Sequence, residues 1–237
     1  MKRNFKKIFV AGHKGLLGSA LIKQLKNNKH NLIFTADKKK LDLINKYKVN
    51  NFFKKNSFDE IYMSAAKVGG ILFNKNYPAE FIYENLMIAA NIINAAWLTN
   101  VKKLIFIGSS CIYPKFSKSP IKENSLLSGQ LEKTNEAYAI AKISGIKLCE
   151  FYNKQYKTDF RAVMLTNLYG PNDHYGALDS HVLPALLRKF HIAKMKKSPK
   201  VTVWGTGNVF REFLFSKDAA DACIHLMFLS ESKLSNF

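Results

Sequence analysis

Short apolar, β-branched runs alternate along this chain with longer segments of helical period. The helical segments include residues 16–28 and 77–100, whose apolar positions recur every three or four residues. The runs that read as strands are residues 6–12, 31–37, 59–65, 102–108 and 159–170. Strands separated by helices pair in parallel through crossover connections. The sequence therefore predicts an α/β fold built on a doubly wound parallel sheet.

The pattern changes after about Gly170, where the chain reads as a loop, a basic helix, a short strand with turn glycines, and a strand followed by a helix. These elements are expected over residues 169–184, 183–194, 201–210 and 211–228, respectively. We therefore expect two domains. The doubly wound domain covers residues 1–170, and a smaller, partial α/β domain covers residues 171–237, with some elements returning to the first domain.

The charge balance is strongly basic, with 37 Lys and Arg against 17 Asp and Glu and a formal net charge of +20. Clustered cations recruit nucleic acid, but here the lysines are spread along the whole chain and no recognition helix or RNA-binding motif accompanies them. We therefore expect no nucleic-acid partner. The same excess suits small anionic ligands.

The cysteines and the apolar runs bear on the compartment. Cys111, Cys149 and Cys223 are odd in number and lack metal-ligand spacing, so we expect neither disulfides nor a metal site. Cys149 and Cys223 fall within helical patterns and are interpreted as packing residues. No uncharged apolar stretch of about 18 residues is present, which predicts no membrane association. Together these features lead us to expect a cytoplasmic protein.

A glycine-rich turn follows the first predicted strand. Gly12, Gly15 and Gly18 are spaced three apart, and a helix begins among them. Such glycines allow a sharp turn, let a pyrophosphate approach the backbone and let the helix pack closely, while the helix N-terminus faces the phosphates. Three glycines alone could be simple turn chemistry, but their place in a βαβ unit predicts a dinucleotide site of the Rossmann type.

The end of the second predicted strand carries both an acid and several cations. Asp37 stands where an acid usually accepts from the ribose hydroxyls of NAD, but Lys38, Lys39 and Lys40 follow it directly. Cations here accommodate the extra phosphate of NADP. We expect NADP, with Lys14 and Lys38 at its 2′-phosphate and Asp37 turned away. The alternative is a solvated lysine run.

Tyr138 and Lys142 stand four residues apart, on one face of a predicted helix. A lysine one turn from a tyrosine is expected to lower the phenol's pKa and to bind a nicotinamide ribose. The pair indicates a catalytic site more strongly when Ser109 is considered with it. Ser109 ends the fourth predicted strand and could hydrogen-bond a reacting oxygen, with Ser110 as the alternative. Together they predict an oxidoreductase that exchanges a proton with a carbonyl or alcohol oxygen.

With these residues in place the chain resembles the extended short-chain dehydrogenase/reductases. Within them it is similar to the GDP-L-fucose synthase family of epimerase/reductases, which act on GDP-4-keto-6-deoxy-D-mannose. The segments that carry this resemblance run in order over nearly the whole chain: AAKVGGI, GSSCIYPK, NEAYAIAKISGIKLCE, TNLYGPND, SHVLPALLR, VWGTG and REFL. The resemblance implies NADPH-dependent epimerisation at C3 and C5 followed by reduction at C4. It makes residues 1–170 the NADP-binding domain and residues 171–237 part of a substrate-binding domain.

The resemblance also assigns roles to residues. It makes Cys111 the base that removes protons beside the ketone and His181 the acid that returns them. Without it, Cys111 reads as packing and His181 as a cap or surface residue. The implied cofactor contacts are Gly12, His13, Lys14, Gly15, Leu16, Leu17, Gly18, Lys38, Leu41, Lys142, Leu165, Asn167, Leu168 and His181. Asn167 is also expected there because ligands bind at the carboxyl ends of such strands.

Substrate contacts implied by the resemblance are Lys189, Trp204 and Arg211, with Arg188 as an alternative to its neighbour. Cations suit a diphosphate, although a basic helix face and a core tryptophan are the simpler interpretations. The family continues beyond the equivalent of Phe237, so we expect a truncated second domain. We also expect a homodimer. The rival hypotheses are another nucleotide-sugar epimerase or dehydratase, and a catalytically silent nucleotide-binding remnant.

Overall fold

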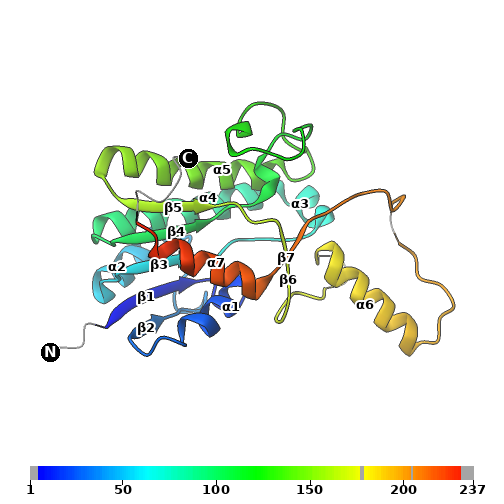
Figure 1. Ribbon diagram of the computed structural model, residues 1–237, viewed down its shortest axis with the longest axis horizontal. Coiled ribbons are helices and arrows are strands. Elements are labelled where there is room, and N and C mark those ends of the chain that lie inside the picture. The colour runs from blue at the N-terminus through cyan, green and yellow to red at the C-terminus, as the bar shows by residue number, and fades with distance from the viewer. Residues whose placement is uncertain (1–4, 177–178, 204, 231–237) are drawn as a thin grey trace.

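The computed structural model describes residues 5–176, 179–203 and 205–230, and it contains a five-stranded parallel sheet (Figure 1). The order is β2-β1-β3-β4-β5, so the chain winds outward from β1 in both directions. The strands are β1 (Lys6–Ala11), β2 (Asn31–Phe34), β3 (Glu60–Met63), β4 (Lys103–Ile107) and β5 (Asp159–Val163). This arrangement confirms the predicted doubly wound sheet of the Rossmann type.

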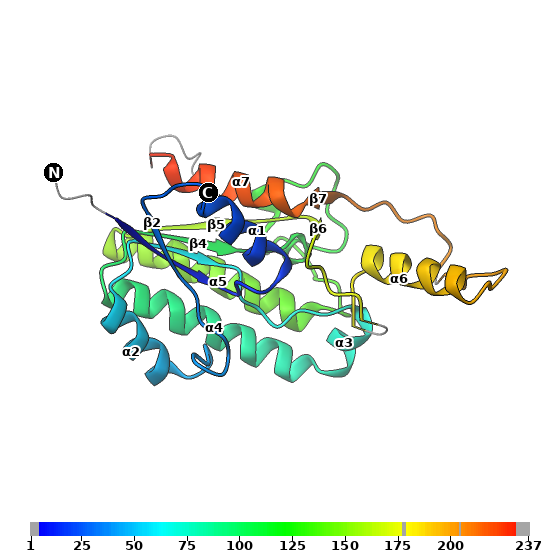
Figure 2. The same cartoon turned by 90° about the horizontal axis from the view of Figure 1, so that it is seen from below.

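Two helical layers cover the sheet, as Figure 2 shows from the side. One layer contains α2 (Lys46–Asn56), α4 (Pro78–Leu98) and α5 (Glu136–Tyr156), and the other contains α1 (Leu16–Leu25) and α7 (Ser216–Phe228). Side chains alternate along β1 accordingly. Phe9 packs toward the first layer, whereas Ile8 and Val10 pack toward the second. Strands buried on both faces explain why these runs are almost continuously apolar.

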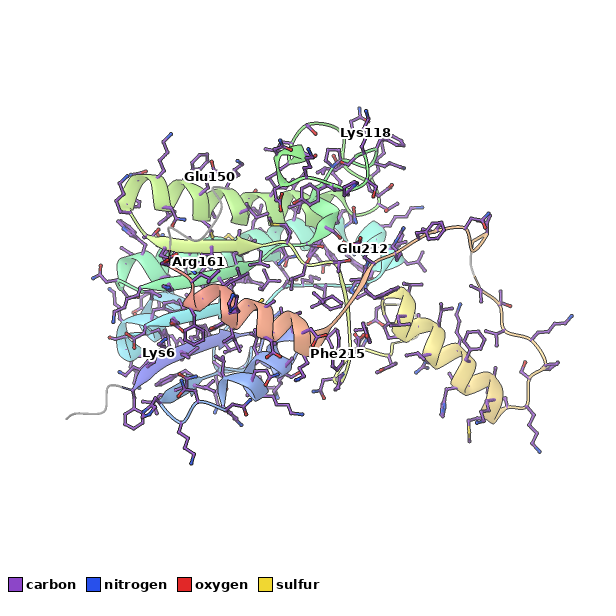
Figure 3. All side chains as sticks on the ribbon, in the orientation of Figure 1. Lys6, Lys118, Glu150, Arg161, Glu212 and Phe215 are labelled. Atoms are coloured by element: carbon purple, nitrogen blue, oxygen red, sulfur yellow. The ribbon has the colours of Figure 1, made fainter. Side chains whose placement is uncertain are left out.

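The last helix returns to the sheet although it lies far along the sequence. Cys223 and Met227 of α7 are buried against the β1–β3–β4 face. Two cations hold the end of the helix, where carbonyl groups lack partners within the helix. Lys103 Nζ donates to Met227 O at 2.8 Å, and Arg161 donates to Leu229 O at 2.9 Å (Figure 3). This packing explains the continuous core on that face.

The run predicted as one strand over 159–170 forms two strands in different sheets. β5 ends at Val163, and β6 (Asn167–Tyr169) pairs in parallel with β7 (Phe213–Phe215) in a separate two-stranded sheet. Where the polypeptide leaves the first sheet, the side chains of Thr166 and Asn167 donate to Glu212 O, at 2.9 and 3.1 Å. The apolar run hides this break, since both pieces are strand-like.

The segment around α6 (Val182–Met195) stands apart from the two-layered core (Figures 1 and 2). The helix is confirmed, but Pro184 is its one fully buried residue among those described. The short strand predicted over 201–210 is wrong for the described residues, which form no strand. Gly205 and Gly207 have positive φ there, and Phe210 is 95% exposed.

Candidate active site

The glycine-rich turn joins β1 to α1, and two of its three glycines leave no room for a side chain. Gly12 has φ +81°, and a Cβ there would lie 2.6 Å from Ala65 N. A Cβ on Gly18 would lie 2.1 Å from Gly12 O, and Gly15 N donates to the same oxygen at 3.0 Å. No side chain caps the N-terminus of α1. The turn therefore fits a dinucleotide, whose pyrophosphate would meet backbone N–H groups at this helix end.

The acid after β2 does not turn away, contrary to our expectation. Asp37 Oδ1 lies 2.9 Å from Lys14 Nζ and 3.2 Å from His13 Nε2. The Lys14 ammonium holds the pKa of Asp37 below its usual value. Lys38 instead points toward α4, with its Nζ 3.8 Å from Glu84 Oε2. Leu41 is buried and its N–H donates to Asp37 O at 2.8 Å, which fixes the turn that carries these charges.

Four predicted catalytic residues meet beyond the carboxyl end of β4. Ser109 follows that strand, and Cys111 lies in the 3-10 turn Ser110–Ile112, which packs against α5. Tyr138 and Lys142 occupy successive turns of α5, with Lys142 Nζ 5.6 Å from the centre of the Tyr138 ring. Lys142 Nζ donates to Ile107 O at 2.7 Å. Ser110 is exposed, so Ser109 is the better placed of the two serines.

The electrostatics of this cluster differ from the prediction for Tyr138. Burial, with a smaller contribution from Cys111, raises the pKa of Tyr138 rather than lowering it. Lys142 is itself 5% exposed, and burial lowers its pKa to about 8. Lys142 still carries its charge at neutral pH, but that charge is not among the causes that shift the pKa of Tyr138, so burial decides the direction. The protein surroundings alone therefore favour the protonated phenol, the form that can donate a proton to an oxygen.

The Cys111 thiol likewise has a raised pKa, because burial outweighs the other effects. A hydrogen bond with Ser109 and the charge of Lys142 act in the opposite direction. The protein surroundings alone therefore favour the neutral thiol, although these two neighbours favour its ionisation. Cys149 and Cys223 are fully buried in the two cores, which confirms their packing role.

His181 is the N-cap residue of α6 and is exposed. Among the described residues, no contact joins its side chain to Cys111 or Tyr138. Its segment is tied to the loop after β3 by a hydrogen bond from Gly70 N to Asp179 O at 2.9 Å. Leu165, Asn167 and Leu168 follow β5, beside the same edge of the sheet. That edge is where ligands of open α/β sheets bind.

The residues expected at the substrate do not converge. Lys189 Nζ donates to Thr202 O at 3.2 Å, and Arg188 donates to Tyr175 O at 3.2 Å. Arg211 is exposed and donates to the neighbouring carbonyl of Phe210 at 2.8 Å. Trp204 lies outside the described residues. The structure thus places these cations along α6 and the segment that follows it, without forming one pocket from them.

One charged group at the site was missed from the sequence. Lys67, in the loop after β3, pairs with Glu80 and, at 2.7 Å, with Glu84 of α4. Asn85 holds its backbone from both sides, accepting from Lys67 N at 2.9 Å and donating to Lys67 O at 3.0 Å. The quoted motif AAKVGGI contains Lys67, but the carboxylates lie on a distant helix. The spacing of four residues between Glu80 and Glu84 places both carboxylates on one helix face, and this was the sequence signal that could have predicted a cation bound between them.

Comparisons with known proteins agree with this geometry. The model of the NAD dependent epimerase/dehydratase family matches residues 8–235. GDP-L-fucose synthase from Escherichia coli K12 is 52% identical over 224 residues, which are 94% of this chain and 70% of the relative. GDP-L-fucose synthase 1 from Arabidopsis thaliana is 51% identical over 93% of this chain and 68% of its own length.

Solved structures give the same picture. A GDP-L-fucose synthetase from Naegleria fowleri bound to NADP has a TM-score of 0.87 at 30% identity, over 97% of this chain and 79% of that chain. A GDP-D-glycero-L-gluco-heptose synthase from Campylobacter jejuni, solved in the presence of NADPH, has a TM-score of 0.87 at 39% identity, over 96% of this chain and 75% of that chain. The first of these neighbours is thus bound to NADP, and the second was solved in the presence of NADPH.

Proposed function

This chain belongs to the NAD dependent epimerase/dehydratase family, and from the site it builds we propose that it converts GDP-4-keto-6-deoxy-D-mannose to GDP-L-fucose with NADPH. The observation that carries this proposal is the grouping of Ser109, Cys111, Tyr138 and Lys142 at one end of the sheet. Relatives about half identical to this chain bear the name GDP-L-fucose synthase.

Epimerisation is assigned to Cys111. Its thiolate takes a proton from a carbon beside the ketone, and the electron pair of the broken C–H bond moves to the ketone oxygen as an enolate. Ser109 and the protonated Tyr138 are the donors that stabilise this oxygen. His181 returns a proton to the opposite face of the carbon when α6 brings it to the substrate. The hydrogen bond with Ser109 and the charge of Lys142 assist formation of the thiolate.

Reduction is assigned to Tyr138 and Lys142. NADPH, when bound at the glycine-rich turn, supplies the hydride for C4. The phenol of Tyr138 donates its proton to the C4 oxygen, and its raised pKa keeps that proton available until the oxygen becomes basic. Lys142, fixed by Ile107 O, holds the nicotinamide ribose. Lys14 and Lys38 are assigned to the adenosine phosphate, and Lys189, Trp204 and Arg211 to the GDP-sugar.

We further propose that residues 1–170 act as the cofactor domain and residues 171–237 as part of a substrate domain. The chain is proposed to form a homodimer through the outer surface of α4 and α5. This surface exposes several large apolar side chains: Tyr83 (59%), Leu98 (49%), Ile140 (38%) and Phe151 (55%). Analytical ultracentrifugation of the purified chain tests the dimer.

The described helices include none long and apolar enough to cross a membrane.

The activity is tested by incubating the purified chain with NADPH and GDP-4-keto-6-deoxy-D-mannose. NADPH oxidation that yields GDP-L-fucose, identified by NMR, is the expected result. NADPH binding without turnover would contradict the proposal and favour a silent nucleotide-binding protein. The heptose synthase at 39% identity suggests a second candidate, a GDP-heptose substrate. Faster turnover of a GDP-4-keto-heptose in the same assay would favour that candidate.

A further inference from the structure

The loop after β3, residues 64–70, contacts the segment that carries His181. Gly70 N donates to Asp179 O at 2.9 Å. A Cβ on Gly70 would lie 2.8 Å from Ser180 O, which is too close for a side chain to be accommodated there. Asp179 and Ser180 directly precede His181 in the chain. Two close backbone contacts therefore join Gly70 to the turn that carries His181.

Hydrogen bonds from buried asparagines fix this loop. Asn74 is buried, and its Nδ2 donates to Gly69 O at 2.8 Å and to Gly70 O at 3.2 Å. Asn85 of α4 holds the backbone of Lys67 from both sides, at 2.9 and 3.0 Å. The loop therefore presents the N–H of Gly70 in a fixed direction.

The same loop is fixed relative to Tyr138. Phe81 of α4 is fully buried, and its ring centre lies 6.4 Å from that of Tyr138. On its other side lies Phe73, at 5.6 Å, in α3 (Ile71–Asn76), which follows the loop (Figures 1 and 2). Lys67 Nζ lies 5.8 Å from the centre of the Phe81 ring. Helix α4 therefore supports both the loop and the catalytic tyrosine.

The segment around α6 needs such a contact because it has little core of its own. Pro184 is the one fully buried residue of α6. The hydrogen bond from Ser180 Oγ to Gly176 O, at 2.7 Å, stays within the segment. The bond from Gly70, by contrast, ties the segment to the part of the molecule that carries Tyr138.

We propose that Gly70 positions His181 for the return of protons during epimerisation, through its N–H group and its lack of a side chain. The inference rests on the proposed function. Inversion at C3 or C5 requires that Cys111 removes a proton from one face of the carbon and that His181 returns one to the other. With His181 displaced, the thiol formed at Cys111 exchanges its proton with the solvent and returns it to the original face. The sugar then exchanges hydrogen without inversion.

The test is Gly70→Ala in the full chain, incubated with GDP-4-keto-6-deoxy-D-mannose in heavy water and followed by NMR. Gly70 has φ −65°, which alanine readily adopts, so the variant differs mainly by its clash with Ser180 O. Inversion should fall about tenfold or more, because a misplacement of about 1 Å is enough to disable a catalytic group. Deuterium entry without inversion should largely persist, and NADPH should bind as before.

Gly69→Ala is the matched control, since it adds the same methyl group one residue earlier. Its Cβ would meet Phe73 Cδ1 at 2.6 Å, on a partly exposed ring that can turn, rather than the backbone beside His181. Inversion should stay close to that of the unmodified chain. Hydrogen exchange reports the displacement without turnover. The Ala185 N–H, which donates to His181 O at 3.0 Å, should exchange faster in Gly70→Ala than in Gly69→Ala.

Unchanged inversion in Gly70→Ala would overturn the inference. An equal loss of deuterium entry and inversion would also overturn it, since the variant would then disturb the whole site rather than His181. The same loss of inversion in Gly69→Ala would show that the contact with Ser180 is not the cause. An unmodified chain that neither exchanges nor reduces the sugar would contradict the proposed function, and the role of Gly70 with it. The behaviour of the unmodified chain therefore separates the two failures.

Discussion

The doubly wound region and the segment around α6, residues 171–212, differ sharply in how far their large apolar side chains are buried. Phe53, Ile92 and Phe106 in the first are at most 1% exposed, whereas Phe190 and Phe210 in the second are 55% and 95% exposed. Both regions have helices of normal composition and period. The comparison teaches that the cofactor half is stabilised by its own core, whereas the described residues around α6 contribute little to such a core.

The largest expected difference between the regions concerns stability. Phe53 is fully buried and packs against Phe9 and Phe58, with ring centres 5.7 and 5.4 Å apart. Phe53→Ala should lower the free energy of unfolding by about 3–5 kcal/mol. Phe190→Ala on α6 should change it by less than about 0.5 kcal/mol. Urea unfolding of both variants measures this, and similar losses would show that α6 belongs to the same cooperative core.

A second difference concerns charged side chains that are buried. Among the described residues, none of residues 171–212 has a buried charged side chain, whereas the doubly wound region has several. The pKa of Lys142 is lowered from 10.5 to about 8, so the unfolded chain binds more protons between these pH values. Lys142 therefore makes the free energy of unfolding rise with pH in this window, by up to about 3 kcal/mol. The cost of burying Lys142 is fully present below pH 8 and falls steadily as the pH rises to 10.5, where the unfolded group also loses its proton.

The cysteines make the free energy of unfolding fall as the pH rises, which opposes the effect of Lys142. Burial raises their pKa values, so the unfolded chain loses these protons at lower pH than the folded chain does. The quantity to measure is therefore the difference between the unmodified chain and Lys142→Met. Unfolding free energies taken between pH 7.5 and 9.5 should show a less positive slope for the variant. Equal slopes would mean that Lys142 keeps its charge throughout.

Two glycines give a smaller and more local comparison. A Cβ at Gly18 would meet backbone at 2.1 Å, whereas at Gly205 it would meet nothing within 4 Å despite a φ of +85°. Gly18→Ala should cost about 1–3 kcal/mol and weaken NADPH binding. Gly205→Ala carries only the strain of its backbone conformation, about 1–2 kcal/mol, and should leave NADPH binding unchanged. Calorimetric titration of NADPH distinguishes them, and equal weakening would place Gly205 at the cofactor.

The sheet, its helices and the glycine-rich turn could be predicted because their signals are local and periodic. The break between β5 and β6 could not, since Thr166 and Asn167 interrupt an apolar run that continues on both sides. Charge states were also beyond prediction. The i, i+4 spacing placed Tyr138 and Lys142 on one face correctly, but it carried no information on how deeply they are buried. Asp37 was placed correctly and oriented wrongly, because its partner Lys14 lies on another turn.

The most direct test of Cys111 as a base is deuterium entry at C3 and C5 of the 4-keto sugar in heavy water, followed by NMR beside NADPH oxidation. Cys111→Ser replaces the thiol with an alcohol that hardly ionises near neutrality, so exchange should collapse while NADPH still binds. Tyr138→Phe, the matched control, should keep part of the exchange and lose reduction. Exchange by Cys111→Ser as fast as by the unmodified chain would contradict the proposed epimerisation and leave Cys111 a packing residue.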